Sequence, residues 1–260
     1  MSLIVDAQHT LHRLSQLTAG FGNSFLPHRD DDGQASLKWK NGQLWSEKVE
    51  GIQIGLDYIS GKIIIKDNKI IKEVSSRDKT LKMLYFEIKD LLGNYFELQN
   101  DYRLEFNYEL DFDLWDGSTI IIPMENIIQL LIQWRNIAQV VLERLKEMGE
   151  SKADIRVWPH HFDTGKLITK GKDFKEGYGL GYAISDRLSP SPYYYVYEWP
   201  KKNIDYSKFT SRIRGVKWVD KKHWKGAILP VSGDISEKRV KDFYLESLEK
   251  LAGNRKGIFI

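Results

Sequence analysis

The chain has 260 residues, a net charge of +3 and no cysteine, which excludes disulfide bonds, thiolate nucleophiles and cysteine-based metal centres. Its hydrophobic fraction of 42% and its many aromatic residues exclude a disordered chain and indicate a folded protein with its own core. No segment approaches the roughly 18 apolar residues that cross a bilayer, and the N-terminal apolar run is too short for a secretory signal. We therefore expect a cytoplasmic protein without a membrane partner.

The N-terminal region predicts a helix followed by a strand. Asp6 can cap a helix whose apolar residues recur at helical spacing, and Gly20 and Gly22 are expected to end it. Apolar and polar residues alternate over residues 52–58, which is the period of a half-buried strand.

A hairpin and a second helix follow. Two apolar runs within residues 62–74 predict a β-hairpin, with Asp67 and Asn68 in a tight turn that has positive φ. The apolar residues of 80–92 share one helical face, and Gly93 stands where a C-cap is expected.

The longest predicted helix lies in the middle of the chain. Pro123 suits a first helical turn, and Gly149 is expected to end the helix. Its apolar stripe recurs at alternating steps of four and three residues and consists of Ile127, Leu131, Trp134, Ala138, Val141, Leu145 and Met148. Further apolar residues widen this stripe beyond a coiled-coil seam, so we predict a core helix rather than a dimer contact.

The second half of the chain predicts five strands and a closing helix. The strands are expected over residues 154–158, 161–169, 179–184, 193–199 and 225–231. Asp234 and Glu237 have the spacing of a capping box for the last helix, and Gly253 is expected to end it.

This order of elements predicts an α+β fold. Strands follow one another as hairpins, which favours mainly antiparallel sheets with helices packed on one face. We expect an N-terminal α+β half, residues 1–150, that ends in the long core helix, and a C-terminal β-rich half, residues 151–260, with a closing helix. The two halves can pack as one domain, and they suggest a pseudo-repeat of strands followed by a helix.

The string Arg156-Val-Trp-Pro-His-His-Phe-Asp163 is the clearest candidate for a functional site. In an extended chain, His161 and Asp163 would point to one face and His160 to the other. A carboxylate beside an imidazole fixes its tautomer and raises its basicity, as catalytic pairs and metal sites require. The same pair also occurs as a structural network, and the spacing matches no established metal signature. We name His160, His161 and Asp163 as candidate ligand-binding residues, and His161 and Asp163 as candidate metal ligands.

Two further strings, residues 177–186 and 193–199, predict either close packing or contact with a ligand. Alternate glycines in the first string leave one face of a strand bare, so a backbone, a ring or a ligand can approach it. Alternate aromatic residues in the second string form a row on one face of a strand. From these strings we add Ser185, Asp186, Tyr195 and Tyr197 to the candidate ligand-binding residues.

A basic stretch follows the aromatic row. Residues 200–225 contain nine Lys and Arg against two Asp, and aromatic residues beside basic ones can form a platform for single-stranded nucleic acid. The rest of the chain is net negative, which opposes the approach of a polyanion. We therefore do not predict nucleic acid as the main partner, and expect weak, non-specific binding at ~50 mM salt that is lost by ~200 mM.

The chain resembles a bacterial family of uncharacterised proteins that carry a Trp-Pro-His-His-Phe-Asp signature, which stands here at residues 158–163. The resemblance extends to three further segments: Phe25–Asp32, Pro192–Pro200 and Gly226–Leu229. It therefore covers most of the chain and implies a bacterial source. It implies no activity, because the family has none assigned.

Two segments depart from the family pattern. Ser185-Asp186 is shorter than the Ser-Pro-Gly-Asp of the family, and Lys221–Trp224 replaces a His-Thr-Glu segment. If that His and Glu bind a metal in relatives, only His223 could substitute here, which weakens the metal hypothesis.

Three functions from different classes remain open, and the sequence identifies no cofactor. The preferred one is binding of a small anionic or aromatic ligand near the His-His-Phe-Asp string. One alternative is a metal-assisted or His/Asp-based hydrolase, completed by Asp186 or His223, and another is a nucleic-acid or protein-partner module. Ligand binding ranks first because the chain contains no phosphate loop, no nucleophile motif and no complete catalytic constellation.

Overall fold

The computed structural model describes residues 3–98, 102–145, 154–170, 176–200 and 205–253. The chain forms two compact units, one of Met1–Ile132 with Arg156–Phe162 and one of Gln133–Ile155 with Asp163–Ile260. This division differs from the predicted boundary after residue 150. The helix α3 (Glu125–Arg144) begins in the first unit and continues in the second.

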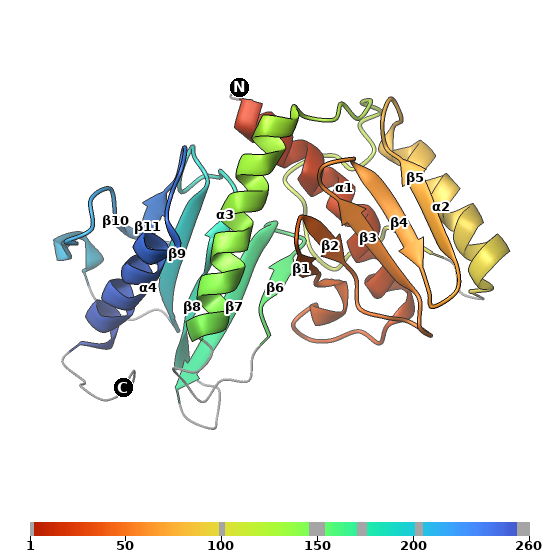
Figure 1. The fold of residues 1–260 in the computed structure, drawn as a ribbon. Coiled ribbons are helices and arrows are strands. Elements are labelled where there is room, and N and C mark those ends of the chain that lie inside the picture. The colour runs from red at the N-terminus through yellow and green to blue at the C-terminus, as the bar shows by residue number, and fades with distance from the viewer. Residues whose placement is uncertain (1–2, 99–101, 146–153, 171–175, 201–204, 254–260) are drawn as a thin grey trace. The chain divides into compact units, whose positions relative to one another are not determined.

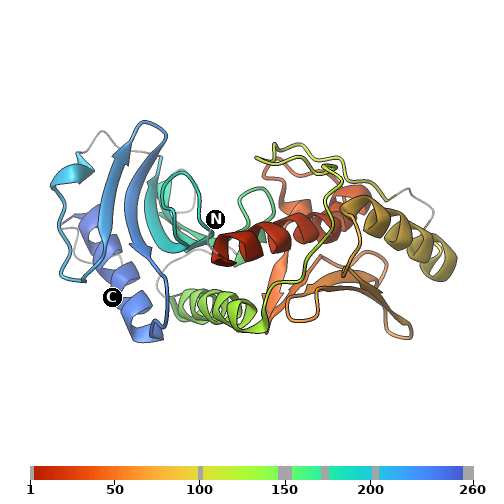
Figure 2. The ribbon, with the colours of Figure 1, turned by 90° about the horizontal axis from the view of Figure 1, so that it is seen from above.

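The first unit contains a five-stranded antiparallel sheet with its strands in chain order. Its elements are α1 (Leu3–Phe25), the 3-10 turn η1 (Gly33–Ala35), β1 (Lys38–Lys40), β2 (Gln43–Trp45), β3 (Gln53–Asp57), β4 (Lys62–Lys66), β5 (Ile71–Ser75), α2 (Leu81–Phe96) and β6 (Arg156–Trp158). The helices α1 and α2 lie on one side of β1 to β5 (Figure 2). In β6, Val157 exchanges backbone hydrogen bonds of 2.8 and 2.9 Å with Leu37.

The first helix is longer than predicted, because Gly20 and Gly22 lie where other segments pack closely against the helix and do not end it. A Cβ atom at Gly20 would lie 2.3 Å from Leu104 Cδ2, and one at Gly22 would lie 2.0 Å from the Gln34 carbonyl oxygen. Neighbouring segments therefore approach the helix too closely for any larger residue. The helix continues past both glycines, and Asp6 lies inside its first turn rather than before it.

The turn between β4 and β5 is held by a side chain rather than by positive φ. Asp67 Oδ1 accepts hydrogen bonds from the backbone N–H groups of Lys69 (2.7 Å) and Ile70 (2.6 Å). The predicted hairpin is present, but neither Asp67 nor Asn68 has positive φ, so the predicted primed turn type is wrong. The carboxylate satisfies the turn's N–H groups and makes the left-handed conformation unnecessary.

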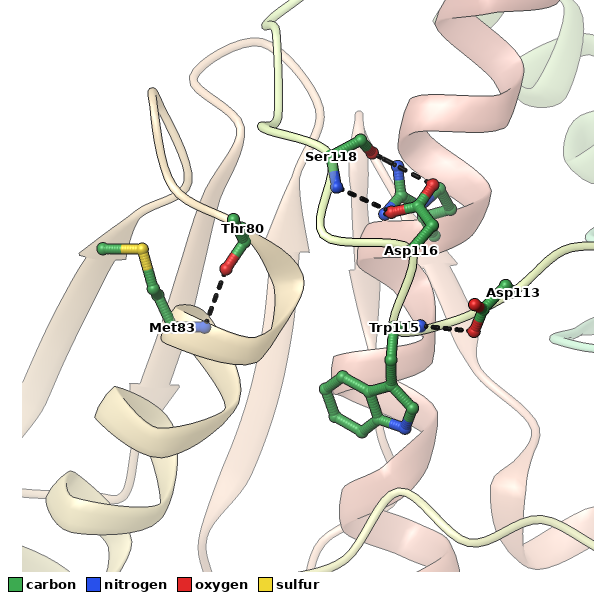
Figure 3. A network of polar contacts seen from close by, with 7 residues as sticks. Thr80, Met83, Asp113, Trp115, Asp116 and Ser118 are labelled. Carbon is green, nitrogen blue, oxygen red and sulfur yellow. Dashed lines mark hydrogen bonds and ion pairs between the residues drawn. The ribbon is translucent and has the colours of Figure 1, made fainter.

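Helix α2 begins where the sequence predicts. Thr80 is its N-cap, and its hydroxyl accepts a hydrogen bond of 3.2 Å from the backbone N–H of Met83 (Figure 3). The helix continues past Gly93, whose missing side chain would meet no atom within 4 Å. It ends at Glu97, which takes the left-handed conformation expected of a C-cap.

The second unit contains strands in the order β10, β11, β9, β8 and β7, all antiparallel to their neighbours. Its elements after α3 are β7 (Asp163–Lys170), β8 (Glu176–Ala183), β9 (Tyr193–Trp199), the 3-10 turn η3 (Tyr206–Lys208), β10 (Lys217–Lys221), β11 (Trp224–Pro230) and α4 (Glu237–Ala252). Because β11 lies between β9 and β10, this strand order differs from the simple meander of the first unit.

Helices α3 and α4 cover one face of this second sheet (Figure 1). The Tyr194 hydroxyl donates to the Trp134 carbonyl oxygen of α3 at 3.0 Å, and the Tyr244 hydroxyl of α4 donates to the Gly181 carbonyl oxygen at 2.9 Å. Trp134 has no exposed surface, as expected of a core helix. Ser236, rather than the predicted Asp234, caps α4.

The two antiparallel sheets, with helices on one face of each, form an α+β fold as the sequence predicted. Of the predicted long helix, Met148 and Gly149 lie outside the described residues. Within the described part of the chain, no helix is both long enough and apolar enough to cross a membrane.

Candidate functional site

The His-His string forms a turn, so the predicted extended strand is wrong at this point. The backbone N–H of Phe162 donates to the carbonyl oxygen of Trp158 at 2.7 Å, and Phe162 has a φ of 54°. Pro159 has no N–H to donate to a strand partner, which ends β6 at Trp158. His161 and Asp163 therefore do not share one face of a strand.

The buried imidazole at this turn belongs to His12 of α1, a residue that no motif in the sequence marked. Its Nε2 lies 2.7 Å from the Pro159 carbonyl oxygen, and Gln16 Nε2 donates to the same oxygen at 2.9 Å. The ring stacks on Phe162 and meets the edge of Phe112, with both ring centroids 5.0 Å away. Burial lowers the pKa of His12 to about 4.

His160 lies half-buried among three other rings. Its ring centroid is 4.3 Å from that of His161, 5.6 Å from that of Tyr108 and 6.2 Å from that of Trp158. Burial, followed by the nearby His161, lowers the pKa of His160 to about 4 against the opposing effect of Asp32. His161 is exposed.

Among the residues that it describes, the structure gives neither of these two imidazoles the carboxylate partner that a catalytic pair or a metal site would require. Within the described residues, neither His160 nor His161 makes a hydrogen bond or an ion pair. The bonded histidine is His12, because the turn points its Pro159 carbonyl toward α1.

The loop before η1 approaches the same turn. Arg156 Nη1 of β6 lies 3.6 Å from Asp31 Oδ2, and His28 Nδ1 lies 3.9 Å from Asp32 Oδ1. The Tyr108 hydroxyl donates to Gln16 Oε1 at 3.0 Å, and burial raises the pKa of that hydroxyl. The first unit thus brings the segment at residues 28–32 to the His-His turn.

Asp163 belongs to the second unit, where its partner is a phenol. The Tyr195 hydroxyl donates to Asp163 Oδ2 at 2.5 Å, and Asp163 is only 9% exposed. Burial, followed by the charge of Asp163, raises the pKa of Tyr195 well above its usual value. Tyr197 shows the same two causes for its raised pKa, so both phenols stay protonated beside the carboxylate.

Asp186 organises the turn that follows β8. Its Oδ1 accepts hydrogen bonds from the backbone N–H groups of Leu188 (2.7 Å) and Ser189 (3.3 Å), and its Oδ2 accepts one from the Tyr193 hydroxyl (2.7 Å). Ser185 precedes it and is half-buried. The carboxylate of Asp186 therefore stabilises the turn in addition to any role toward a ligand.

The alternate glycines of β8 accommodate tyrosine rings. A Cβ atom at Gly179 would lie 2.2 Å from Tyr197 Cζ, and one at Gly181 would lie 2.5 Å from Tyr195 Cζ. The bare face of this strand is therefore filled by the side chains of β9. The structure gathers the predicted residues into two groups, His160 and His161 in the first unit and Asp163, Ser185, Asp186, Tyr195 and Tyr197 in the second.

Ion pairs occupy part of the basic stretch. They join Lys208 to Asp205 (3.3 Å), Arg212 to Glu246 (3.6 Å) and Lys225 to Asp220 (2.7 Å). Lys201 and Lys202 lie outside the described residues.

A metal site finds no support beyond the sequence pattern. The two predicted ligands, His161 and Asp163, belong to different units, and the described ranges hold no group of three or more His, Asp or Glu side chains placed to bind a metal ion. No model of a known protein family matches the chain, and neither a curated protein nor a solved structure matches it significantly.

Proposed function

We propose that the first unit binds a small aromatic ligand with an anionic group at the turn of residues 158–161. The supporting observation is a set of four adjoining rings: Tyr108, Trp158, His160 and His161, with centroid separations from His160 of 4.3 to 6.2 Å. Three of these rings are half-buried and His161 is exposed, so they present π faces and edges to solvent. A planar ligand can stack on such a surface.

A guanidinium lies beside these rings and could take the anionic group. The Arg156 guanidinium carbon is 5.7 Å from the ring centre of Trp158, and its ion pair with Asp31 is long, at 3.6 Å. A carboxylate on the ligand could form the shorter, bidentate contact that a guanidinium favours. Because the pKa of His160 is about 4, its ring is neutral at pH 7 and suits stacking.

Side chains of α1 hold the backbone of this turn in place, which favours binding. His12 and Gln16 both contact the Pro159 carbonyl oxygen, and Tyr108 in turn contacts Gln16. These bonds fix the backbone that carries Trp158, so little ordering is left for the ligand to impose. The hydrolase hypothesis has less support, because an imidazole with a pKa of about 4 is a weak base at pH 7.

Proton NMR of the imidazole Cε1–H signals tests this proposal, since the chain has six histidines. We expect benzoate to shift the signals of His160 and His161. Acetate, which has no ring, and phenol, which has no charge, should each shift them less. His160→Ala and Arg156→Gln should weaken the response to benzoate.

His223→Gln is the matched control, because His223 is exposed and belongs to the second unit. This variant should respond to benzoate as the wild-type protein does. A benzoate response that survives in His160→Ala, or one that is as large at His223 as at His160, would contradict the proposal.

A further inference from the structure

We propose that the second unit binds single-stranded nucleic acid on the face of its sheet opposite to α3 and α4. The surface, here called the aromatic–lysine face, consists of Tyr197 and Trp199 on β9, Trp224 on β11, and Lys217 and Lys221 on β10. It lies in the second unit and shares no residue with the proposed ligand site of the first unit.

Strand register places these side chains on one face. Tyr197 pairs with Gly226 across β9 and β11, and Trp224 lies two residues from Gly226 on the same strand. Lys221 pairs with Trp224 across β10 and β11, and Lys217 lies four residues from Lys221. Because strand side chains alternate between faces, all of these point to the same side.

Glycines under the rings leave them lying along the sheet. Tyr197 lies over Gly179, and a Cβ atom at Gly226 would lie 2.9 Å from Trp224 Cη2. A ring that lies along the sheet turns one π face toward the strands and the other outward. Tyr197 and Trp224 are half-buried and Trp199 is 46% exposed, so part of each outer surface is available for stacking.

The β10 edge of this face carries positive charge, whereas the Asp163 carboxylate beside Tyr197 is buried. Lys217 and Lys221 are both exposed, and among the described residues neither makes an ion pair. Lys221 Nζ donates to the Arg187 carbonyl oxygen at 3.3 Å. On the opposite face of the same two strands, by contrast, Lys225 is paired with Asp220 at 2.7 Å.

The arrangement favours a single strand over other occupants. Aromatic rings lie on the neighbouring β-strands β9 and β11, and two lysines lie on the edge strand β10. Proteins that bind single-stranded nucleic acid use the same combination of rings for base stacking and basic side chains for phosphate contacts. Charge alone would give only weak binding that salt removes. Stacking adds a component that depends on the rings and is less sensitive to salt.

Fluorescence polarisation of a labelled oligothymidylate, titrated at about 50 and 200 mM salt, tests the proposal. Lys217→Gln combined with Lys221→Gln should reduce the slope of log affinity against log salt by about 1.4, at about 0.7 per phosphate contact. Trp224→Leu should weaken binding about tenfold at both salt concentrations, because it removes one stacking ring.

Lys238→Gln combined with Lys241→Gln on α4 removes the same charge from outside this face and should leave the slope and the affinity unchanged. If Trp224→Leu does not fold, Trp199→Ala at the exposed end of β9 replaces it. No binding at the lower salt concentration, equal effects of the two lysine pairs, or full affinity after loss of the tryptophan ring would each overturn the proposal. The proposal would also be overturned if these residues bound a protein and did not bind oligothymidylate.

Discussion

Mild acid should destabilise the first unit through His12. The ring is 4% exposed, and burial lowers its pKa from 6.5 in the unfolded chain to about 4 in the folded one. Between these two values the unfolded chain binds a proton that the folded chain does not. The free energy of unfolding is therefore complete above pH 6.5 and falls as the pH drops toward 4. A shift of this size corresponds to about 3 kcal/mol, at about 1.36 kcal/mol per pKa unit.

His12→Gln isolates this contribution. Glutamine keeps a donor for the Pro159 carbonyl oxygen but cannot titrate, and it loses the ring contacts with Phe162. The variant should be less stable than the wild-type protein at pH 7, and the difference should shrink by about 3 kcal/mol at pH 4. His160, whose pKa is also about 4, titrates in both proteins, so its effect cancels.

Urea unfolding at pH 7, 5.5 and 4 measures the difference. His223→Gln is the control, because His223 is exposed and belongs to the second unit, and the stability of this variant should follow the wild-type curve. A difference between wild type and His12→Gln that stays constant with pH would refute the reasoning. It would mean that the imidazole is neutral in the unfolded chain or charged in the fold.

Four further substitutions test packing and a helix cap, and urea unfolding or thermal melts measure the effect of each. Trp134→Ala should cost about 3–5 kcal/mol because the ring is fully buried, and loss of dimerisation with unchanged monomer stability would contradict the core helix. Gly181→Ala should cost about 1–3 kcal/mol because its Cβ atom would lie 2.1 Å from the Thr164 carbonyl oxygen. Gly93→Ala should instead stabilise α2 by about 0.4–1 kcal/mol, because a Cβ atom there would meet no atom within 4 Å. If Gly93→Ala destabilised the protein more than Gly181→Ala, the sheet around Gly181 would have to move to accept a Cβ atom. Thr80→Ala should cost about 1 kcal/mol, and no change would mean that water replaces the cap.

Hydrophobic periodicity predicted the long elements because their burial is regular. The stripes of α2 and α3 and the alternation over residues 52–58, which contain β3, reflect regular burial. The strand β10 escaped prediction because only Trp218 and Val219 interrupt its charged residues. Gly20 and Gly22 resemble helix ends in the sequence, but they allow the close approach of segments distant in sequence, which no local pattern contains.

The candidate site was only partly predictable for a related reason. The sequence identifies the His-His turn, but His12 contacts Pro159 across 147 residues, and only the fold brings them together. A signal was present, since Gln8, His12 and Gln16 place polar side chains at helical spacing on a buried face of α1. Conversely, residues that are adjacent in sequence do not all share one site. The positive φ of Phe162 turns the chain, so Asp163 meets Tyr195 rather than an imidazole.

An aromatic ring lies over a glycine in both sheets. The two rings differ in how much of their surface is exposed, and this difference decides which one we propose as a binding surface. In the first unit a Cβ atom at Gly55 would lie 2.6 Å from Trp45, so that ring also lies along its sheet. Trp45 is 8% exposed, and Lys66 Nζ sits 3.8 Å from its ring centre, which covers the outer face with a side chain of the same unit. Tyr197 over Gly179 has the same geometry but remains half-buried, on the same sheet face as two lysines that make no ion pair among the described residues. The pairing of ring and glycine therefore predicts a flat sheet surface, and of these two rings Tyr197 leaves more of its surface accessible for the base stacking that we propose.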